Sequence, residues 1–341
     1  MPRTVLVTGA TGYIAKHIVL QLLERGDRVR GSVRSEKRAG DLRASLQTAL
    51  SDPTKLHNLS TVTLDLTSDD GWDAAMVDVD AVIHTASPFP LVQPKDENEV
   101  IRPAVDGALR ALRAAQAAGV RRVVLTSSAV AVITAVRPSN GRAYTEADWS
   151  DASSPAATPY AKSKTLAERA AWDFVRDSGG SIDLTCINPT LVVGPPLDLD
   201  YGTSIEVIER VLRAKDPMLP NVGFGTVDVR DVATAHVQAL DVPESIGQRV
   251  LINDRFMWFA DMARAVKTAL PDRKIVTRVA PDFVVRFLGL FDRSIATIRN
   301  DLGKSLSIDT TRARELLGIA FRDTRQSVGE TARWLVDKGR V

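Results

Sequence analysis

The sequence predicts an α/β protein built on a doubly wound parallel sheet, and three observations support this prediction. Short runs of β-branched and other apolar residues alternate with longer segments whose apolar residues recur at helical spacing. The first run leads directly into a turn that contains two glycines, and the alternation continues as far as Pro189. Such alternation is typical of βαβ units, in which a helical crossover makes neighbouring strands parallel.

The expected strands are TVLV, DRVRGSVR, TVTLDL, AVIHTA, RRVVLTSS and IDLTCINP. The expected helices lie around residues 14–25, 37–50, 71–77, 100–118 and 160–176. Gly26 and Gly119 directly follow two of these helices, where a left-handed residue commonly ends a helix. After Pro189 the pattern becomes less regular, which indicates a smaller C-terminal lobe that binds the substrate. We expect the sheet domain over residues 1–190 with a return segment at about 222–250, and the lobe mainly over 191–221 and 251–341.

The composition limits the class of protein. Of the 341 residues, 44% are hydrophobic and 25% are charged, which is ordinary for a globular protein. The net charge of +2 gives no indication of a nucleic-acid or anionic-membrane partner. The single cysteine, Cys186, lies in an apolar run, so we expect a buried thiol and a cytoplasmic protein. Charges throughout residues 1–25 argue against a secretory signal, and the apolar stretch FVVRFLGLF is too short to span a membrane.

The stretch VLVTGATGYIAKHI, residues 5–18, is a candidate dinucleotide-binding turn. Gly9 permits a tight turn between strand and helix, and Gly12 lets the backbone approach a pyrophosphate. The helix N-terminus then presents free N–H groups to the phosphates. Ala15 stands where a third glycine is usual; this position governs how closely the helix packs on the sheet, and alanine is the smallest replacement. A glycine turn without a ligand is the alternative, but the order of strand, turn and helix favours a Rossmann-type site.

The end of the second expected strand distinguishes NADP from NAD. An acidic residue there binds the ribose 2′-hydroxyl of NAD, whereas arginine accommodates the 2′-phosphate of NADP. The sequence RGSVRSEKR places Arg34 at the strand end, with Lys37 and Arg38 about one helical turn beyond. Glu36 argues weakly against a phosphate site, and a solvated basic turn is the alternative. The balance favours NADP (NADPH) as the cofactor.

The stretch TPYAKSKTLAE places Tyr160 and Lys164 four residues apart on one face of an expected helix. A tyrosine hydroxyl has an ordinary pKa of about 10, and a neighbouring ammonium lowers it toward the range that acid–base catalysis needs. RVVLTSSA ends the fifth expected strand with Thr126, Ser127 and Ser128, at the edge where open α/β sheets bind ligands. We expect one serine to bond a substrate oxygen and the other to cap the strand.

Together these stretches resemble the extended short-chain dehydrogenase/reductase family. Within it, they resemble the branch of dihydroflavonol reductases, cinnamoyl-CoA reductases and NADPH-dependent aldehyde (methylglyoxal-type) reductases. The matching stretches are VTGATGYIAKHIV, GSVRS, HTASPF, IRPAVDG, RRVVLTSSA, YAKSK, NPTLVVGP, DVRDVATAH and IGQRV. The resemblance implies NADPH-dependent reduction of an aldehyde or ketone to the alcohol, with hydride from nicotinamide C4 and the proton from Tyr160.

The resemblance also implies roles for individual residues. Ser128 would orient the carbonyl, Tyr160 would donate the proton, and Lys164 would tune that donor while holding the nicotinamide ribose. With the turn and the basic strand end, the expected cofactor-binding residues are Gly9, Thr11, Gly12, Tyr13, Ile14, Arg34, Lys37, Arg38, Asp65, Leu66, Thr85, Ala86, Ser87, Thr126, Tyr160, Lys164, Pro189, Val192 and Ser204. The expected substrate-pocket residues are Phe89, Ala129, Ile133, Leu191, Tyr201 and Phe224.

The expected pocket departs from that of its relatives. The flavonoid enzymes carry a polar residue five positions after the catalytic serine, where this chain has Ile133. The yeast-type aldehyde reductases tend to have aromatic residues where this chain has Ala129 and Leu191. We therefore expect a roomier, apolar pocket for a medium-sized aldehyde or ketone, aromatic ones included.

Two other functions remain open. A nucleotide-sugar epimerase or dehydratase would usually keep NAD, with an acidic residue where Arg34 stands, and a non-catalytic dinucleotide sensor would often lack Tyr160 or Lys164. No metal is expected, because Asp228, Asp231 and His236 match no ligand spacing. We expect a small-molecule carbonyl partner, no nucleic acid, no membrane, and a monomer or homodimer.

Overall fold

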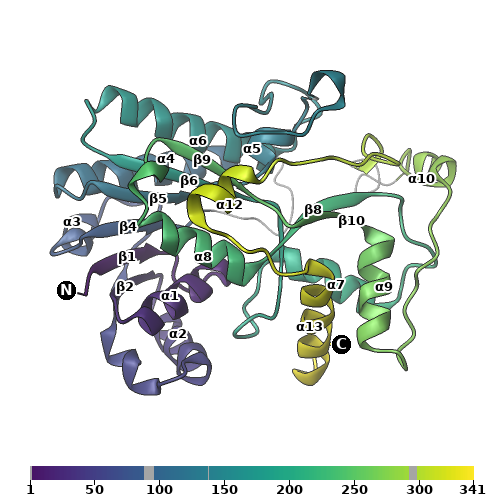
Figure 1. Ribbon diagram of the computed structural model, residues 1–341, viewed down its shortest axis with the longest axis horizontal. Helices are drawn as coiled ribbons and strands as arrows, with labels where there is room; N and C mark the ends of the chain where they lie inside the picture. Colours follow the sequence, from purple (N-terminus) through teal and green to yellow (C-terminus); the bar gives the residue numbers. More distant parts are fainter. Residues whose placement is uncertain (1, 88–95, 137, 292–297) are drawn as a thin grey trace.

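A seven-stranded sheet forms the centre of the computed structural model, which describes residues 2–87, 96–136, 138–291 and 298–341 (Figure 1). Its strands, in spatial order, are β3 (Leu59–Thr63), β2 (Arg28–Val33), β1 (Thr4–Thr8), β4 (Ala81–His84), β5 (Arg122–Thr126), β6 (Asp183–Pro189) and β9 (Gln248–Ile252). All of its pairings are parallel. The order reverses between β1 and β4, which is the point where doubly wound sheets bind ligands. The predicted fold class is therefore confirmed.

Helices cover both faces of this sheet (Figure 1). They are α1 (Tyr13–Arg25), α2 (Glu36–Ala49), α3 (Trp72–Met76), α4 (Asn98–Ala117), α6 (Pro159–Asp177) and α8 (Val229–Ala239). On one face α4 packs against α6 and α3, and on the other α1 packs against α8 and α2. The strands are thus covered from both sides, and Val5, Leu6 and Val7 of β1 are excluded from solvent.

Local sequence signals set where these elements begin and end. Gly26 and Gly119 have φ values of 90° and 73°, so both helices end in the left-handed residues that the sequence predicted. At the start of α6, the Thr158 hydroxyl accepts a hydrogen bond from the Ala161 amide at 3.2 Å. The third strand begins at Leu59, before the expected TVTLDL, and already ends at Thr63; Asp65 then turns the chain by accepting a hydrogen bond from the amide of Thr67.

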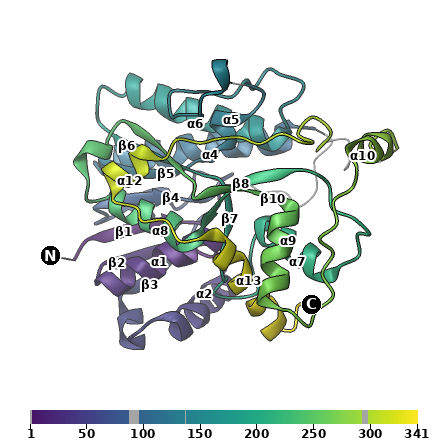
Figure 2. The same cartoon turned by 45° about the vertical axis from the view of Figure 1, so that its right-hand side comes forward.

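A smaller sheet and several helices follow β6. Its strands, in the order β10-β8-β7, are β10 (Arg255–Trp258), β8 (Gly223–Asp228) and β7 (Leu191–Val193). The accompanying helices are α7 (Thr203–Arg213), α9 (Phe259–Ala269), α10 (Asp282–Leu288), α12 (Thr311–Leu317) and α13 (Thr324–Asp337). Helices α7, α9 and α13 pack together beside the smaller sheet (Figures 1 and 2). The chain then returns to the large sheet: α8 packs against α1, and β9 joins the large sheet as its last strand. The strand β8 belongs to the smaller sheet.

The other elements of the described residues are short helices: α5 (Val130–Ile133), η1 (Pro53–Asn58), η2 (Ser139–Gly141) and η3 (Pro243–Ser245). Across the described ranges, the longest and most apolar helices still fall short of what a bilayer-crossing segment requires. The division of the chain at residues 190, 221 and 250 stays a prediction.

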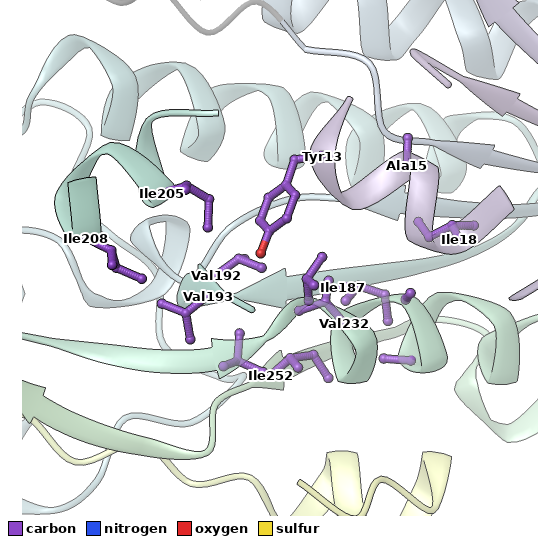
Figure 3. Close-up of a cluster of buried hydrophobic side chains, with 14 of the residues drawn as sticks. Tyr13, Ala15, Ile18, Ile187, Val192, Val193, Ile205, Ile208, Val232 and Ile252 are labelled. Carbon is purple, nitrogen blue, oxygen red and sulfur yellow. The ribbon is translucent and has the colours of Figure 1, made fainter. Parts of the chain in front are cut away.

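One buried cluster joins the two parts of the chain. Figure 3 shows Ala15 and Ile18 of α1 near Ile187 of β6, with Val192 of β7 and Ile205 of α7 in the same cluster. Ala15 is only 1% exposed, in agreement with its interpretation as a packing residue. Because α1 and α7 share a core, the segments after β6 are held close to the glycine-rich turn.

Candidate active site

The glycine-rich turn follows β1 at the point where the sheet order reverses. Gly9 has a φ of +63°, and a Cβ at this position would lie 3.0 Å from the Cα of Ala86. The Gly9 amide donates to the Ser32 hydroxyl at 2.9 Å, and the Gly12 amide donates to the Gly9 carbonyl at 2.8 Å. Gly12 directly precedes α1, whose first turn has no side-chain cap and no acidic residue. The backbone N–H groups of the first helical turn therefore have no side-chain acceptor, and they and the positive end of the helix dipole can bind an anion.

Residues after β4 lie directly against this turn. The Thr8 hydroxyl accepts hydrogen bonds from the amides of Thr85 and Ala86, both at 3.2 Å, and bonds Nδ1 of His84 at 2.9 Å. Ser87 follows on the same segment. Burial, with a smaller effect of the Lys164 charge, lowers the pKa of His84 to about 3. His84 is therefore neutral and serves to hold the strand end.

The basic residues predicted to distinguish NADP lie at the rim of the turn. Arg38 donates to the Thr11 hydroxyl at 3.1 Å and forms an ion pair with Asp200. Arg34 is exposed, and its charge adds to the lowering of the Asp65 pKa, which hydrogen bonds from Thr67 mainly cause. Lys37 is exposed on α2. Leu66 packs against α4, because a Cβ on Gly107 of that helix would lie 3.3 Å from the Leu66 side chain.

The loop before α7 crosses the first turn of α1. The Tyr13 hydroxyl donates to the Gly194 carbonyl at 2.6 Å, and its ring lies among buried side chains (Figure 3). The buried ammonium of Lys16 pairs with Asp198 and donates to the Asp200 carbonyl at 3.0 Å. The side chain of Tyr13 is thus held in the core, and Ile14 packs against the same core while partly buried. The predicted cofactor contacts of both residues stay predictions. Lys16, Asp198 and Asp200 were not among the predicted residues.

The three predicted catalytic residues come together at the carboxyl end of β5. Tyr160 and Lys164 lie one turn apart near the start of α6, and Ser128 directly follows β5. The Ser128 side chain is hydrogen bonded to Tyr160, which partly offsets the rise that burial causes in the tyrosine pKa. Burial lowers the pKa of Lys164 to about 8, against the opposing charge of Glu168. Near neutral pH this arrangement therefore presents a protonated tyrosine beside a charged lysine.

The residues next to Ser128 point elsewhere. The Thr126 hydroxyl bonds Nε2 of His236 on α8 at 2.7 Å, so this predicted cofactor residue is held from the other face of the sheet. The Ser127 hydroxyl donates to Oε2 of Glu168 at 2.5 Å. One of the two serines is thus held by a buried carboxylate, while the other faces the tyrosine.

A buried polar cluster beneath these strand ends is absent from the sequence prediction. Glu168, one turn after Lys164 on α6, forms an ion pair with Arg249 of β9 at 2.6 Å. The Asn188 amide donates to Glu168 at 2.8 Å and to the Ser128 carbonyl at 3.1 Å. The spacing of Glu168 from Lys164 places both on one helix face, which is the signal that could have suggested it.

The other predicted residues lie at the end of β6 or in the segments that follow β5 and β6. The Pro189 carbonyl accepts a hydrogen bond from the Ala129 amide at 2.9 Å, which joins β6 to β5. Ala129 and Ile133 belong to a small apolar cluster. Half-buried or buried positions on β7, α7 and β8 are occupied by Leu191, Val192, Ser204 and Phe224.

Tyr201 and Phe89 are different cases. Tyr201 lies edge-on to Trp334, and its hydroxyl accepts a hydrogen bond from Arg340 at 2.9 Å, so these contacts place it against the C-terminal helix. Phe89 lies outside the described residues. The predictions for both positions are untested by the structure.

The discounted carboxylates have structural partners. Asp228 caps α8 and pairs with Arg230, and Asp231 pairs with Arg322. The part of the chain that the structure describes contains no group of three His, Cys, Asp or Glu side chains suited to hold a metal ion. Cys186 is fully buried, as its apolar surroundings in the sequence predicted.

Comparison with known families agrees with this geometry. Residues 5–253 match the family model described as the NAD dependent epimerase/dehydratase family, which covers well over half of the chain. The chain belongs to this family. Its relatives are extended short-chain dehydrogenases/reductases, as the motifs had indicated.

Several relatives of this extended short-chain dehydrogenase/reductase match almost end to end. The chain is 31% identical to NADPH-dependent methylglyoxal reductase GRE2 of Saccharomyces cerevisiae, over 99% of this chain and 100% of that protein. It is 31% identical to cinnamoyl-CoA reductase 1 of Arabidopsis thaliana, over 99% of this chain and 91% of that protein. The crystal structure of yeast Gre2 with NADPH superposes with a TM-score of 0.82 at 29% identity, covering 99% of this chain and 100% of that one.

Proposed function

We propose that this chain is an NADPH-dependent carbonyl reductase that converts an aldehyde or ketone to the alcohol. The convergence of Ser128, Tyr160 and Lys164 beside the glycine-rich turn carries the proposal. The relatives support it, because they include proteins named as methylglyoxal reductase, ketoreductase and cinnamoyl-CoA reductase.

The residues around the turn fit NADPH. Gly9 and Gly12 leave the backbone open at the uncapped N-terminus of α1, where a pyrophosphate binds favourably. Arg38 reaches the turn and Arg34 lies nearby at the end of β2, so guanidinium groups are available for a 2′-phosphate. Lys164 would hold the nicotinamide ribose, and Pro189 and Val192 would lie along the nicotinamide. When bound, NADPH supplies the hydride.

The chain itself orients the carbonyl and moves the proton. The Ser128 hydroxyl donates to the substrate oxygen and keeps that oxygen within reach of Tyr160. Tyr160 gives its phenolic proton to the oxygen as negative charge develops there. The Lys164 ammonium stabilises the phenolate that remains and so lowers the tyrosine pKa below the value that burial alone would give.

The substrate is a medium-sized carbonyl compound with an apolar or aromatic group. Ala129 is small, and Ile133 and Leu191 offer no hydrogen bond to a hydroxylated ring. Phe224 on β8 adds an apolar side chain from the smaller sheet. Such a pocket favours substrates that bury apolar area over two- and three-carbon carbonyls.

The test follows absorbance at the nicotinamide band with NADPH, and separately NADH, against small, branched aliphatic and aryl aldehydes and ketones. We expect faster NADPH oxidation with the larger carbonyls than with methylglyoxal, and little oxidation of NADH. Equal use of NADH would overturn the cofactor assignment alone. Binding of NADPH without reduction of any carbonyl would overturn the reductase and favour an epimerase or a dinucleotide sensor.

A further inference from the structure

Glu168 is a buried carboxylate that the mechanism above does not use. Its side chain has 0% exposure on α6. Its two oxygens accept hydrogen bonds from four side chains: Ser127 at 2.5 Å, Arg249 at 2.6 Å, Asn188 at 2.8 Å and Trp172 at 3.3 Å. Burying a charge is costly unless it is fully paired, and apolar side chains often stabilise such a position as well or better. A carboxylate here therefore calls for a role beyond packing.

Three of these donors come from neighbouring strands of the large sheet. Ser127 directly follows β5, Asn188 lies on β6 and Arg249 lies on β9. Asn188 also donates to the carbonyl of Ser128 at 3.1 Å. One carboxylate on the helix of Tyr160 thus fixes the strand end that carries Ser128.

Arg249 is itself held rigidly. Its guanidinium donates to the carbonyls of Glu146 at 2.8 Å and Asp148 at 2.7 Å. It also lies over the ring of Trp149, 3.7 Å from the ring centroid. The counterion of Glu168 is therefore held by contacts of its own, and the ion pair links β9 to α6.

We propose that Glu168 is a positioning residue, which holds the strand end carrying Ser128 against the helix carrying Tyr160 and Lys164. The inference rests on the proposed reductase function, because it assigns Glu168 a role in that same site. The charged and titratable groups near Glu168 are Lys164 on α6, Arg249 on β9 and the thiol of Cys186 on β6. Its negative charge opposes the lowering that burial causes in the pKa of Lys164.

The main test is Glu168→Gln, which keeps the side-chain size and removes the charge. We expect kcat for an aryl aldehyde to fall about 10- to 100-fold, because small displacements of reacting groups are costly. The dissociation constant of NADPH should change by less than about threefold, since none of the hydrogen-bond partners of Glu168 belongs to the glycine turn. The basic limb of the kcat/KM profile should move to lower pH, because loss of a nearby negative charge lowers the pKa values of Lys164 and Tyr160 alike.

The matched control is Asp231→Asn. Asp231 is 2% exposed and also pairs with an arginine, Arg322, but it contacts none of the three catalytic groups. We expect this variant to lower the thermal midpoint and leave the pH profile in place. A shift of the profile in Asp231→Asn as large as in Glu168→Gln would mean that loss of any buried carboxylate has this effect, and would overturn the proposal.

A second variant, Ser127→Ala, serves if Glu168→Gln does not fold. It removes one donor to Glu168 and leaves the charge in place. We expect kcat to fall about 3- to 10-fold, as for loss of one charge-assisted hydrogen bond, with the basic limb unmoved. A kcat within twofold of wild type in Glu168→Gln, or in Ser127→Ala where the former is unfolded, overturns the positioning role while the wild-type enzyme stays a reductase. A wild-type chain that reduces no carbonyl overturns both proposals.

Discussion

The two halves of the candidate site are built in different ways. The glycine-turn half uses backbone amides and small residues, and its charged groups, Arg34 and Arg38, lie at the exposed or half-exposed rim. The half beside β5 and β6 uses buried side chains, with Ser128 and Lys164 each 8% exposed. The first half suits a large anion that must enter and leave, whereas the second holds a small set of groups in fixed geometry. The carbonyl carbon changes geometry as it is reduced, and fixed catalytic groups can stabilise this change only if the proton donor keeps its position.

The largest expected effect in this comparison comes from the proton donor. Tyr160→Phe should lower kcat about 10³-fold, as for loss of a general acid, and change the dissociation constant of NADPH by less than about threefold. Tyr13→Phe removes a buried hydroxyl from the turn half instead, where it holds the carbonyl of Gly194. That variant should weaken NADPH binding more than it lowers kcat. Steady-state kinetics with fluorescence titration of NADPH distinguishes the two, and a Tyr160→Phe enzyme with a tenth of the wild-type kcat would place the donor elsewhere.

The same contrast explains how much the sequence could predict. Gly9 and Gly12 occur in one short turn, Arg38 lies in the basic stretch after the second strand, and Tyr160 and Lys164 occur four residues apart. Local patterns were therefore enough to predict roles for them. The partners that hold the second half are distant: Arg249 is 81 positions from Glu168, and His236 is 110 positions from Thr126.

Such pairs depend on which strands become neighbours, and no local pattern contains that information. The third strand was predicted, but its end was placed too far along the chain, since a side-chain turn at Asp65 overrides the β-propensity at the end of TVTLDL.

Each half also contains a buried histidine bonded to a strand-end threonine. Burial lowers the pKa of His84, beside Thr8, to about 3 and that of His236, beside Thr126, to about 4. Both folded-state pKa values lie below the ordinary value of about 6.5, so unfolding takes up protons below that pH. Stability is therefore retained above about pH 6.5 and lost as the pH falls toward 4, on the order of 3 kcal/mol for each histidine at pH 4.

Urea unfolding between pH 7 and pH 4 checks this expectation. His17, the third buried histidine, has a pKa lowered to about 4 by burial and adds to the same fall. Replacing it by phenylalanine should make the decline shallower by roughly a third, because one of three similar contributions is removed. A free energy of unfolding that stays constant across this range would contradict the assignment of neutral, buried imidazoles to the two strand ends.

The rim of the turn half should control cofactor choice. Arg38→Ala should weaken NADPH binding about 10- to 100-fold, the range expected for lost charge-assisted bonds to a phosphate, and leave NADH binding nearly unchanged. Asp200→Asn removes the carboxylate that pairs with Arg38, so NADPH should bind several-fold more tightly. Titration of both variants with both cofactors is the measurement. Equal losses for NADPH and NADH in Arg38→Ala would show that Arg38 does not read the 2′-phosphate.

The smallest expected difference concerns the backbone of the turn. Gly9 and Gly26 both have positive φ, but a Cβ would contact Ala86 at 3.0 Å in the first case and nothing within 4 Å in the second. Gly9→Ala should therefore lower the free energy of unfolding by about 1–2 kcal/mol more than Gly26→Ala, beyond the left-handed strain that both share. Chemical denaturation of the two variants gives this difference directly. Equal destabilisation would mean that Ala86 and its neighbours after β4 move aside at little cost in free energy. That result would contradict a turn with a fixed backbone.

Isotope transfer tests the central claim most directly. Wild-type protein and Tyr160→Phe would each be mixed with an aryl aldehyde and NADPH that carries deuterium at both hydrogen positions of nicotinamide C4. The alcohol would be examined by mass spectrometry, and its rate of formation would be measured. We predict one deuterium on the carbinol carbon of the wild-type product, and the same labelled alcohol formed about 10³-fold more slowly by the variant. An unlabelled alcohol, or no alcohol from a wild-type protein that binds NADPH, would contradict carbonyl reduction as the function of this site.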